Sequence, residues 1–102
     1  MILLEFSMSP MDKGESLSPY VSRIINIIDR SGINYRLTAM GTILEGEYDE
    51  VMTVVRGCFK ELEKDCNRIS ISLKMDYRKG SQSRMNSKID KIETLLKRDI
   101  KK

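Results

Sequence analysis

One segment, residues 69–77, alternates strictly between apolar and polar side chains, and this period of two constrains the fold more than any other feature. Its apolar positions are Ile69, Ile71, Leu73, Met75 and Tyr77, and its polar positions are Ser70, Ser72, Lys74 and Asp76. Neighbouring side chains of a strand point to opposite faces of its sheet, so the segment predicts a β-strand with one face toward a core. Residues 2–8 alternate in the same way. We therefore expect a sheet with one covered side.

Two other segments have apolar residues at helical spacing. The first stripe consists of Leu17, Val21, Ile24, Ile25 and Ile28, and the second of Val51, Val54, Val55, Cys58, Phe59, Leu62 and Cys66. The first helix is expected to begin at Ser18, whose hydroxyl would cap it ahead of Pro19, and to end at Gly32. The second helix would be capped by Asp49. Both stripes predict amphipathic helices that cover the sheet.

The segment between these helices predicts a β-hairpin. Residues 33–39 and 42–46 have strand patterns, and Met40 and Gly41 form the short link between them. The order β-α-β-β-α-β, with right-handed crossovers, predicts an α+β fold: a ferredoxin-like sandwich with a four-stranded antiparallel sheet and two helices on one face. An extra C-terminal helix follows, with an apolar stripe made of Met85, Ile89, Ile92 and Leu96.

The length of 102 residues suits one domain, so residues 1–102 are expected to form a single ferredoxin-like domain. Within it we expect a loop at 78–84, the terminal helix at 84–98 and a frayed tail at 99–102. The sequence has no repeat or low-complexity segment that would indicate a second domain.

Composition argues against several classes of function. The chain has no histidine, which removes the usual general base and metal ligand and argues against a catalytic triad. We expect no metal and no cofactor. A net charge of +3 is too small to argue for nucleic acid, and Phe6 and Tyr77 share the helix-facing phase instead of an RNA-stacking face. The apolar N-terminus is short and carries Glu5, so it predicts neither a signal peptide nor a membrane span. We expect a cytoplasmic protein in which Cys58 and Cys66 stay reduced.

The sheet face away from the helices is expected to be open and polar. Three of its strands would contribute Leu3, Glu5, Ser7, Arg36, Thr38, Ser70, Ser72, Lys74, Asp76 and Arg78. The third strand would add either Thr42 and Leu44 or Ile43 and Glu45, depending on the hairpin register. Such a face suits a solvated or self-associating surface, or a wall of hydrogen-bonding groups for a small polar ligand that a second subunit closes.

Charged residues leave two further alternatives open. Glu5, Glu45 and Asp76 could act as an acid and base pair, although ion pairs with neighbouring cations are at least as well supported. A basic cluster follows the last strand and consists of Arg78, Lys79, Arg84 and Lys88. Such a cluster is most often a solvated loop and helix start, and a phosphate contact is the less frequent interpretation.

Four segments together carry a family resemblance. They are EFSMSPM at 5–11, SLSPYV at 16–21, YRLTAMGTILEGEYDEVM at 35–52 and LKMDYR at 73–78. The most specific part is Met-Gly-Thr followed by Glu-Gly before an Asp-Glu-Val-Met helix start. In these segments, spread over nearly the whole chain, the sequence resembles the small thiamine-binding proteins, the one-domain members of the YkoF-like superfamily.

The resemblance implies a ferredoxin-like fold, homo-oligomers built as sheet-to-sheet dimers or tetramers, and binding of thiamine or its hydroxymethylpyrimidine moiety without catalysis. Hydroxyls and a carboxylate would match the aminopyrimidine, an acid would balance the thiazolium, and an aromatic or sulfur surface would stack on the ring. The expected ligand-binding residues are Glu5, Ser7, Tyr35, Thr38, Met40, Gly41, Thr42, Glu45 and Asp76. No nucleic acid or membrane partner is expected. The alternative is a self-associating structural or regulatory module with no small-molecule ligand.

Overall fold

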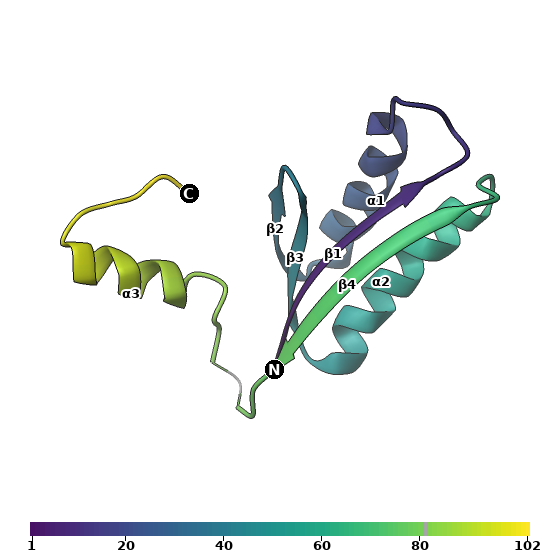
Figure 1. Ribbon diagram of the computed structural model, residues 1–102. Helices are drawn as coiled ribbons and strands as arrows, with labels where there is room; N and C mark the ends of the chain where they lie inside the picture. Colours follow the sequence, from purple (N-terminus) through teal and green to yellow (C-terminus); the bar gives the residue numbers. More distant parts are fainter. Residues whose placement is uncertain (81) are drawn as a thin grey trace.

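The computed structural model describes residues 1–80 and 82–102, and its elements follow the expected order (Figure 1). The strands are β1 (Ile2–Pro10), β2 (Asn34–Thr38), β3 (Gly41–Gly46) and β4 (Ile69–Tyr77). The helices are α1 (Ser18–Ser31), α2 (Tyr48–Glu63) and α3 (Ser87–Leu96). All neighbouring strands are antiparallel, and they form one sheet in the order β2-β3-β1-β4. This arrangement confirms the ferredoxin-like α+β fold with its extra C-terminal helix.

Helices α1 and α2 lie on one side of the sheet, and the hydrophobic core fills the space between (Figure 1). The apolar phase of β1 faces this core, as its alternation predicts. The fully buried residues of the core include Leu4, Ile28, Leu44, Val51, Cys58 and Leu62. Burial raises the pKa of the Cys58 thiol to about 12, so this cysteine stays protonated near neutral pH.

Strand β4 departs from the expected burial, although its position and length follow the alternation. Ile71 and Leu73 belong to its helix-facing phase but remain exposed, and Tyr77 is also exposed. The reason is its place in the sheet, since β4 is an edge strand next to β1. Alternation sets which side a residue points to, but not whether a helix covers it.

The hairpin register settles which residues of β3 share the open face. Glu5 of β1 lies directly across from Ile43, and Leu3 lies across from Glu45. Residues opposite each other in an antiparallel pair point to the same side of the sheet. The third strand therefore contributes Ile43 and Glu45 to the open face, whereas Thr42 and Leu44 point toward the helices.

Both helix starts differ from the expected caps. Leu17 is the residue before the first turn of α1, so Ser18 is already helical, and no side chain caps this end. Glu47 precedes α2 in extended backbone, and Asp49 lies inside the first turn instead of capping it. An acid at this position still interacts favourably with the helix dipole. The end of α1 is as expected, because Gly32 adopts a left-handed conformation at φ 77°.

Helix α3 lies on the side of the sheet opposite α1 and α2, and it contains no buried residue (Figure 1). Two of its apolar residues, Leu95 and Leu96, are 82% and 48% exposed. Glu93 accepts hydrogen bonds from the Ile100 N–H and the Lys102 ammonium, so the tail turns back on the helix. Fraying of residues 99–102 stays a prediction.

Within the described residues, none of the helices has the length and apolarity that crossing a bilayer requires.

Candidate functional site: a groove between the open sheet face and helix α3

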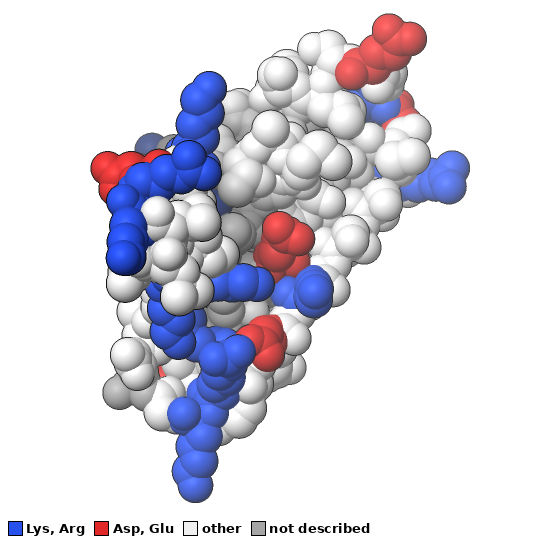
Figure 2. Space-filling view, turned by 60° about the vertical axis from the view of Figure 1, so that its left-hand side comes forward, with Lys and Arg blue, Asp and Glu red and all other residues white. Residues whose placement is uncertain are grey.

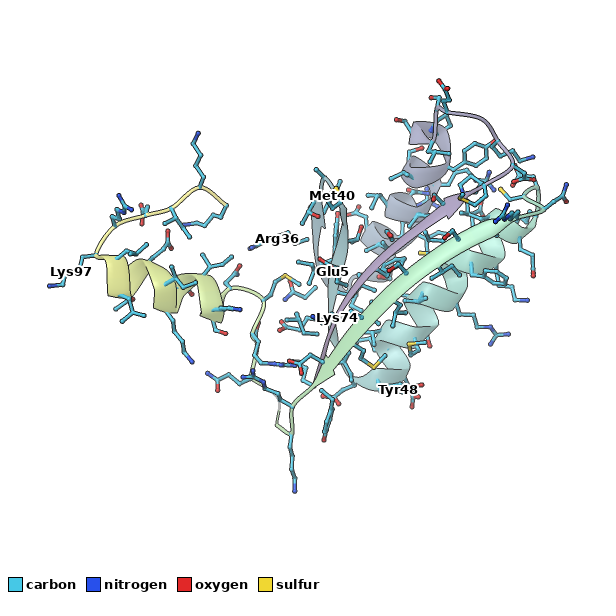
Figure 3. The ribbon with its side chains drawn as sticks, in the orientation of Figure 1. Glu5, Arg36, Met40, Tyr48, Lys74 and Lys97 are labelled. Atoms are coloured by element: carbon cyan, nitrogen blue, oxygen red, sulfur yellow. The ribbon has the colours of Figure 1, made fainter. Side chains whose placement is uncertain are left out.

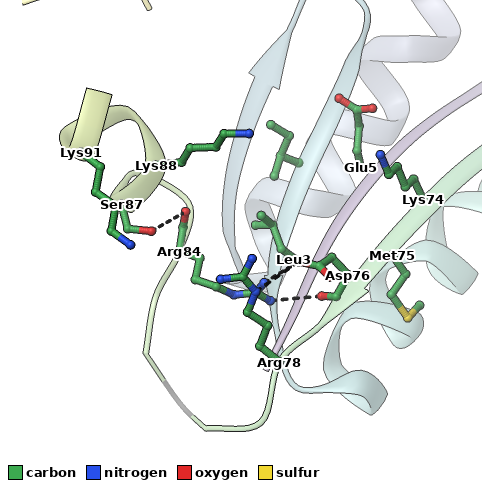
Figure 4. Close-up of a pocket in the computed structure, with 11 residues that line it drawn as sticks. Leu3, Glu5, Lys74, Met75, Asp76, Arg78, Arg84, Ser87, Lys88 and Lys91 are labelled. Atoms are coloured by element: carbon green, nitrogen blue, oxygen red, sulfur yellow. Dashed lines mark hydrogen bonds and ion pairs between the residues drawn. The ribbon is translucent and has the colours of Figure 1, made fainter. Parts of the chain in front are cut away.

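The open sheet face and α3 enclose a groove of about 760 Å³ (Figure 4). Its sheet wall comes from β1, β3 and β4, and its other wall from α3 and the segment before it. The lining residues are Leu3, Glu5, Ile43, Lys74, Met75, Asp76, Arg78, Arg84, Ser87, Lys88 and Lys91. The groove thus combines apolar side chains with carboxylates and cations, which is the lining that a small polar ring system requires.

Glu45 holds the segment before α3 against the sheet. Its side chain is buried, with 3% of the residue exposed, and its carboxylate accepts hydrogen bonds from the backbone N–H groups of Arg84 at 2.6 Å and Met85 at 3.1 Å. The Ser83 hydroxyl and the Asn34 side-chain amide, the latter at 3.0 Å, donate to its other oxygen. The four donors engage both oxygens, so this one side chain connects the segment before α3 to β2 and β3.

The pKa of Glu45 reflects two opposing causes. Burial alone raises it, because a charged carboxylate loses hydration in the interior. The hydrogen bonds from Ser83, Arg84, Asn34 and Met85 favour the ionised form and outweigh burial, so the pKa lies below its ordinary value. Glu45 is therefore ionised at neutral pH and acts as an acceptor.

Arg84 forms the second connection between the α3 segment and the sheet. Its guanidinium donates to the Asp76 carboxylate at 2.6 Å, to the Asp76 carbonyl at 3.1 Å and to the Met1 carbonyl at 3.2 Å. Only 13% of the Arg84 side chain is exposed. A third connection comes from Arg36 on β2, which donates to the side chain of Asn86. The wall formed by α3 is thus fixed at three points of the open face.

The groove carries more positive than negative charge. Its lining has five cationic side chains, those of Lys74, Arg78, Arg84, Lys88 and Lys91, against the carboxylates of Glu5 and Asp76. Figure 2 shows basic side chains gathered over the side of the molecule that α3 forms, next to a hollow. A smaller cavity of about 180 Å³ shares Arg78, Arg84, Ser87 and Lys91 with the groove, and its lining contains no acidic residue among those described.

The structure brings two of the expected ligand-binding residues into this groove, Glu5 and Asp76, and places Glu45 beside it. Asp76 is paired with Arg84, whereas the Glu5 carboxylate has no such partner in the described part of the chain and lies next to Lys74 (Figures 3 and 4). Ser7 also lies on the open face, across from Ser72 on β4. The strand register of β1 with β3 and β4 places Glu5, Ser7, Glu45 and Asp76 on the same face of the sheet.

The remaining expected residues lie elsewhere. Tyr35 and Thr42 are on the helix side of the sheet, and the Tyr35 hydroxyl donates to Asp29 at 2.9 Å. The Thr38 hydroxyl closes the hairpin turn: it donates to the Gly41 carbonyl at 2.8 Å and accepts from the backbone N–H groups of Met40 and Gly41. Met40 is 88% exposed at the hairpin tip (Figure 3). Contact of these residues with a ligand stays a prediction.

The α3 wall was not expected from the sequence. Ser87, Lys88 and Lys91 line the groove, and the two lysines are three residues apart on one helix, so they lie on the same side of it. The one sequence feature that pointed to this wall was the basic cluster after the last strand, which includes Lys88. What sequence patterns lacked was the position of α3, which the contacts of Glu45 and Arg84 set on the open face of the sheet. Among the described residues, no group of acids and cysteines is arranged to hold a metal ion.

Fold and groove define a class of protein: small ferredoxin-like domains with a mixed polar and apolar groove on the open face of the sheet. The family described as Thiamine-binding protein matches residues 4–93, and the chain belongs to this family. A UPF0045 protein of Methanocaldococcus jannaschii is 32% identical over 94 residues, which covers 92% of this chain and 94% of that protein. A UPF0045 protein of Mycobacterium tuberculosis is 32% identical over 98 residues, covering 95% of this chain and 96% of the relative.

Solved structures agree with this assignment. The crystal structure of the Methanocaldococcus jannaschii protein superimposes with a TM-score of 0.81 and covers 89% of this chain and 94% of its own. A Thermotoga maritima protein, provisionally named for thiamine biosynthesis or salvage, is similar with a TM-score of 0.77 and 25% identity, covering 89% of this chain and 97% of that one. The family and the fold expected from the sequence are both confirmed.

Proposed function

We propose that this protein binds thiamine or its hydroxymethylpyrimidine moiety in the groove between the open sheet face and α3, without catalysing a reaction. The observation that carries the proposal is the groove itself, which occurs in a chain of the thiamine-binding family and has a lining that suits such a ligand. Leu3 and Ile43 offer apolar surface to a heteroaromatic ring, and Glu5 offers a carboxylate. The Thermotoga maritima protein named for thiamine salvage supports the same ligand class.

Glu5 is the central residue of this proposal. Of the two carboxylates that line the groove, Asp76 is already paired with Arg84, whereas Glu5 stands beside apolar surface with oxygens available to a ligand. A carboxylate can accept two hydrogen bonds from an aminopyrimidine or balance a thiazolium charge. We assign it the first of these roles, since the amino group and ring of the pyrimidine are present in both proposed ligands.

We also propose that the protein acts as a homo-oligomer in the cytoplasm, with a second subunit closing the groove. Two features support this part: the groove is open to solvent along one side, and α3 leaves Leu95 and Leu96 uncovered. The same uncovered surface favours a second candidate function, a self-associating module that needs no ligand. The two differ in one respect that can be measured, which is whether a small molecule binds.

The test is a calorimetric titration of the purified protein and of Glu5→Gln with thiamine and with hydroxymethylpyrimidine. We expect saturable binding to the wild type and an affinity about tenfold to a hundredfold lower in the variant, since a hydrogen bond to a charged group contributes about 1.5–3 kcal/mol. Glu15→Gln is the matched control, because Glu15 is exposed in the loop before α1, away from the groove. Equal affinities in all three proteins would overturn the role of Glu5, and no binding to any of them would favour the self-associating module.

A further inference from the structure

One end of the groove is lined by cations from two different parts of the chain. We call it the basic end and define it as Arg78, Arg84, Lys88 and Lys91. Arg78 follows β4, Arg84 lies in the segment before α3, and the two lysines project from α3 itself. Three of these side chains also line the adjoining cavity of about 180 Å³, together with Lys79, Gly80, Gln82 and Ser87.

Charge at the basic end is only partly neutralised inside the molecule. Asp76 pairs with Arg84 at 2.6 Å and with Arg78 at 3.7 Å, so a single carboxylate serves two guanidinium groups. The second acid of the groove, Glu5, lies across from Lys74 on the sheet. No carboxylate lines the smaller cavity among the described residues. A ligand that brings two negative charges would therefore be attracted to this end, and a purely cationic ligand repelled.

Arg84 is largely engaged inside the molecule. Three hydrogen bonds, two to Asp76 and one to the Met1 carbonyl, hold its guanidinium, so it adds positive charge to this end while most of its donors are already occupied. Arg78, by contrast, has 71% of its side chain exposed, so its guanidinium is accessible to a ligand. Lys88 and Lys91 face the groove from the opposite wall. An anion between these walls would be contacted from both sides.

We propose that the groove takes the phosphate monoester of its heteroaromatic alcohol in preference to the free alcohol, with the phosphate group at the basic end. The inference rests on the proposed function, since it names the form of the same ligand. Both thiamine and hydroxymethylpyrimidine carry a hydroxyl group that can be esterified. A phosphate monoester bears about −1.5 to −2 charge at pH 7 and offers three acceptor oxygens, which matches guanidinium and ammonium donors.

The geometry also indicates how the ester would be oriented. Glu5 lies across from Ile43 on β3, whereas the basic end lies where β4 leaves the sheet (Figure 4). Leu3, across from Asp76, lies between these two parts of the sheet wall. The ring would thus lie on the sheet and the ester would point toward the segment before α3. Binding would connect α3 to β4 through the phosphate.

The experiment is a calorimetric series with four probes: thiamine, hydroxymethylpyrimidine and the phosphate monoester of each, at low and at high salt. We expect each ester to bind about tenfold or more tightly than its alcohol at low salt, and the difference to shrink at high salt because exposed charges are screened. Equal affinities, or tighter binding of the alcohols, would overturn this inference and leave the proposed function intact. Failure of all four probes to bind would overturn both.

A pair of double variants locates the effect. Lys88→Gln combined with Lys91→Gln should bring the ratio of ester to alcohol affinity toward one. Arg30→Gln combined with Arg56→Gln removes the same charge from exposed positions on α1 and α2, outside the groove, and should leave the ratio unchanged. If both double variants lower the ratio equally, the preference comes from net charge and not from the basic end, which contradicts the proposal. Thermal unfolding of both proteins verifies that each is folded.

Discussion

The Glu45 carboxylate at the end of β3 accepts a hydrogen bond at 2.6 Å from the backbone N–H of Arg84, 39 residues further along the chain. This contact joins the sheet to the segment that leads into α3. Neither a turn nor a helix cap requires a carboxylate at position 45. The structure gives its role: Glu45 accepts hydrogen bonds inside the molecule and holds the α3 wall of the groove.

Replacing Glu45 with Gln should loosen this wall. The amide has one acceptor oxygen, so it cannot reproduce both sets of bonds, and the loss of charge-assisted contacts should cost about 2 kcal/mol. Hydrogen exchange measures the effect locally, and the amides of Arg84 and Met85 should exchange faster, with ligand affinity falling as a consequence. Unchanged exchange at these two amides would contradict the anchoring role, and Glu15→Gln serves as the control.

Acid should release the same contact. The folded-state pKa of Glu45 is lowered, so the unfolded chain binds more protons than the folded chain around the ordinary glutamate pKa. The stabilisation is therefore fully present above that range and is lost as pH falls through the folded-state pKa. Denaturant unfolding of wild type and Glu45→Gln should give curves that converge with falling pH. A difference that stays constant from neutral to acid pH would show that the charge of Glu45 contributes nothing.

Gly41 should not tolerate a side chain, because a Cβ there would lie 2.9 Å from the Phe6 carbonyl oxygen on β1. Gly41→Ala is expected to lower the free energy of unfolding by about 1–3 kcal/mol, the usual cost of overpacking. Gly57→Ala on α2 is the matched control: its Cβ would meet Ile27 at an ordinary 3.5 Å, and helix propensity should raise stability by up to about 1 kcal/mol. Chemical denaturation compares them, and equal effects at both sites would refute the steric argument.

Thr38→Val should destabilise the hairpin by about 1 kcal/mol, since its hydroxyl both donates and accepts within the turn. Thr38→Ser keeps the hydroxyl and should recover most of the loss. Thermal unfolding separates the two variants. If valine is as stable as threonine while ligand affinity falls, the hydroxyl serves the ligand and not the turn.

Sequence patterns determine the elements of this chain well, because alternation in residues 2–8 and 69–77 and two helical stripes leave one plausible topology. They also determine faces: Glu5 and Asp76 point where alternation places them. They fail where a property depends on distant packing. The alternation of β3 leaves two possible sets of residues for the open face, and only the hairpin register places Ile43 and Glu45 there and Thr42 toward the helices. The α3 wall was missed since its place depends on contacts of Glu45 and Arg84, which no local pattern encodes.

The account rests on one claim, that a heteroaromatic ligand occupies the groove between the open sheet face and α3. Chemical-shift mapping by NMR tests it most directly, by following backbone amides of labelled protein during titration with hydroxymethylpyrimidine and thiamine. We predict saturable shifts concentrated in β1, β4 and α3, with those of Glu5 and Lys88 among them. The absence of saturable shifts, or shifts confined to α1 and α2, would contradict the claim.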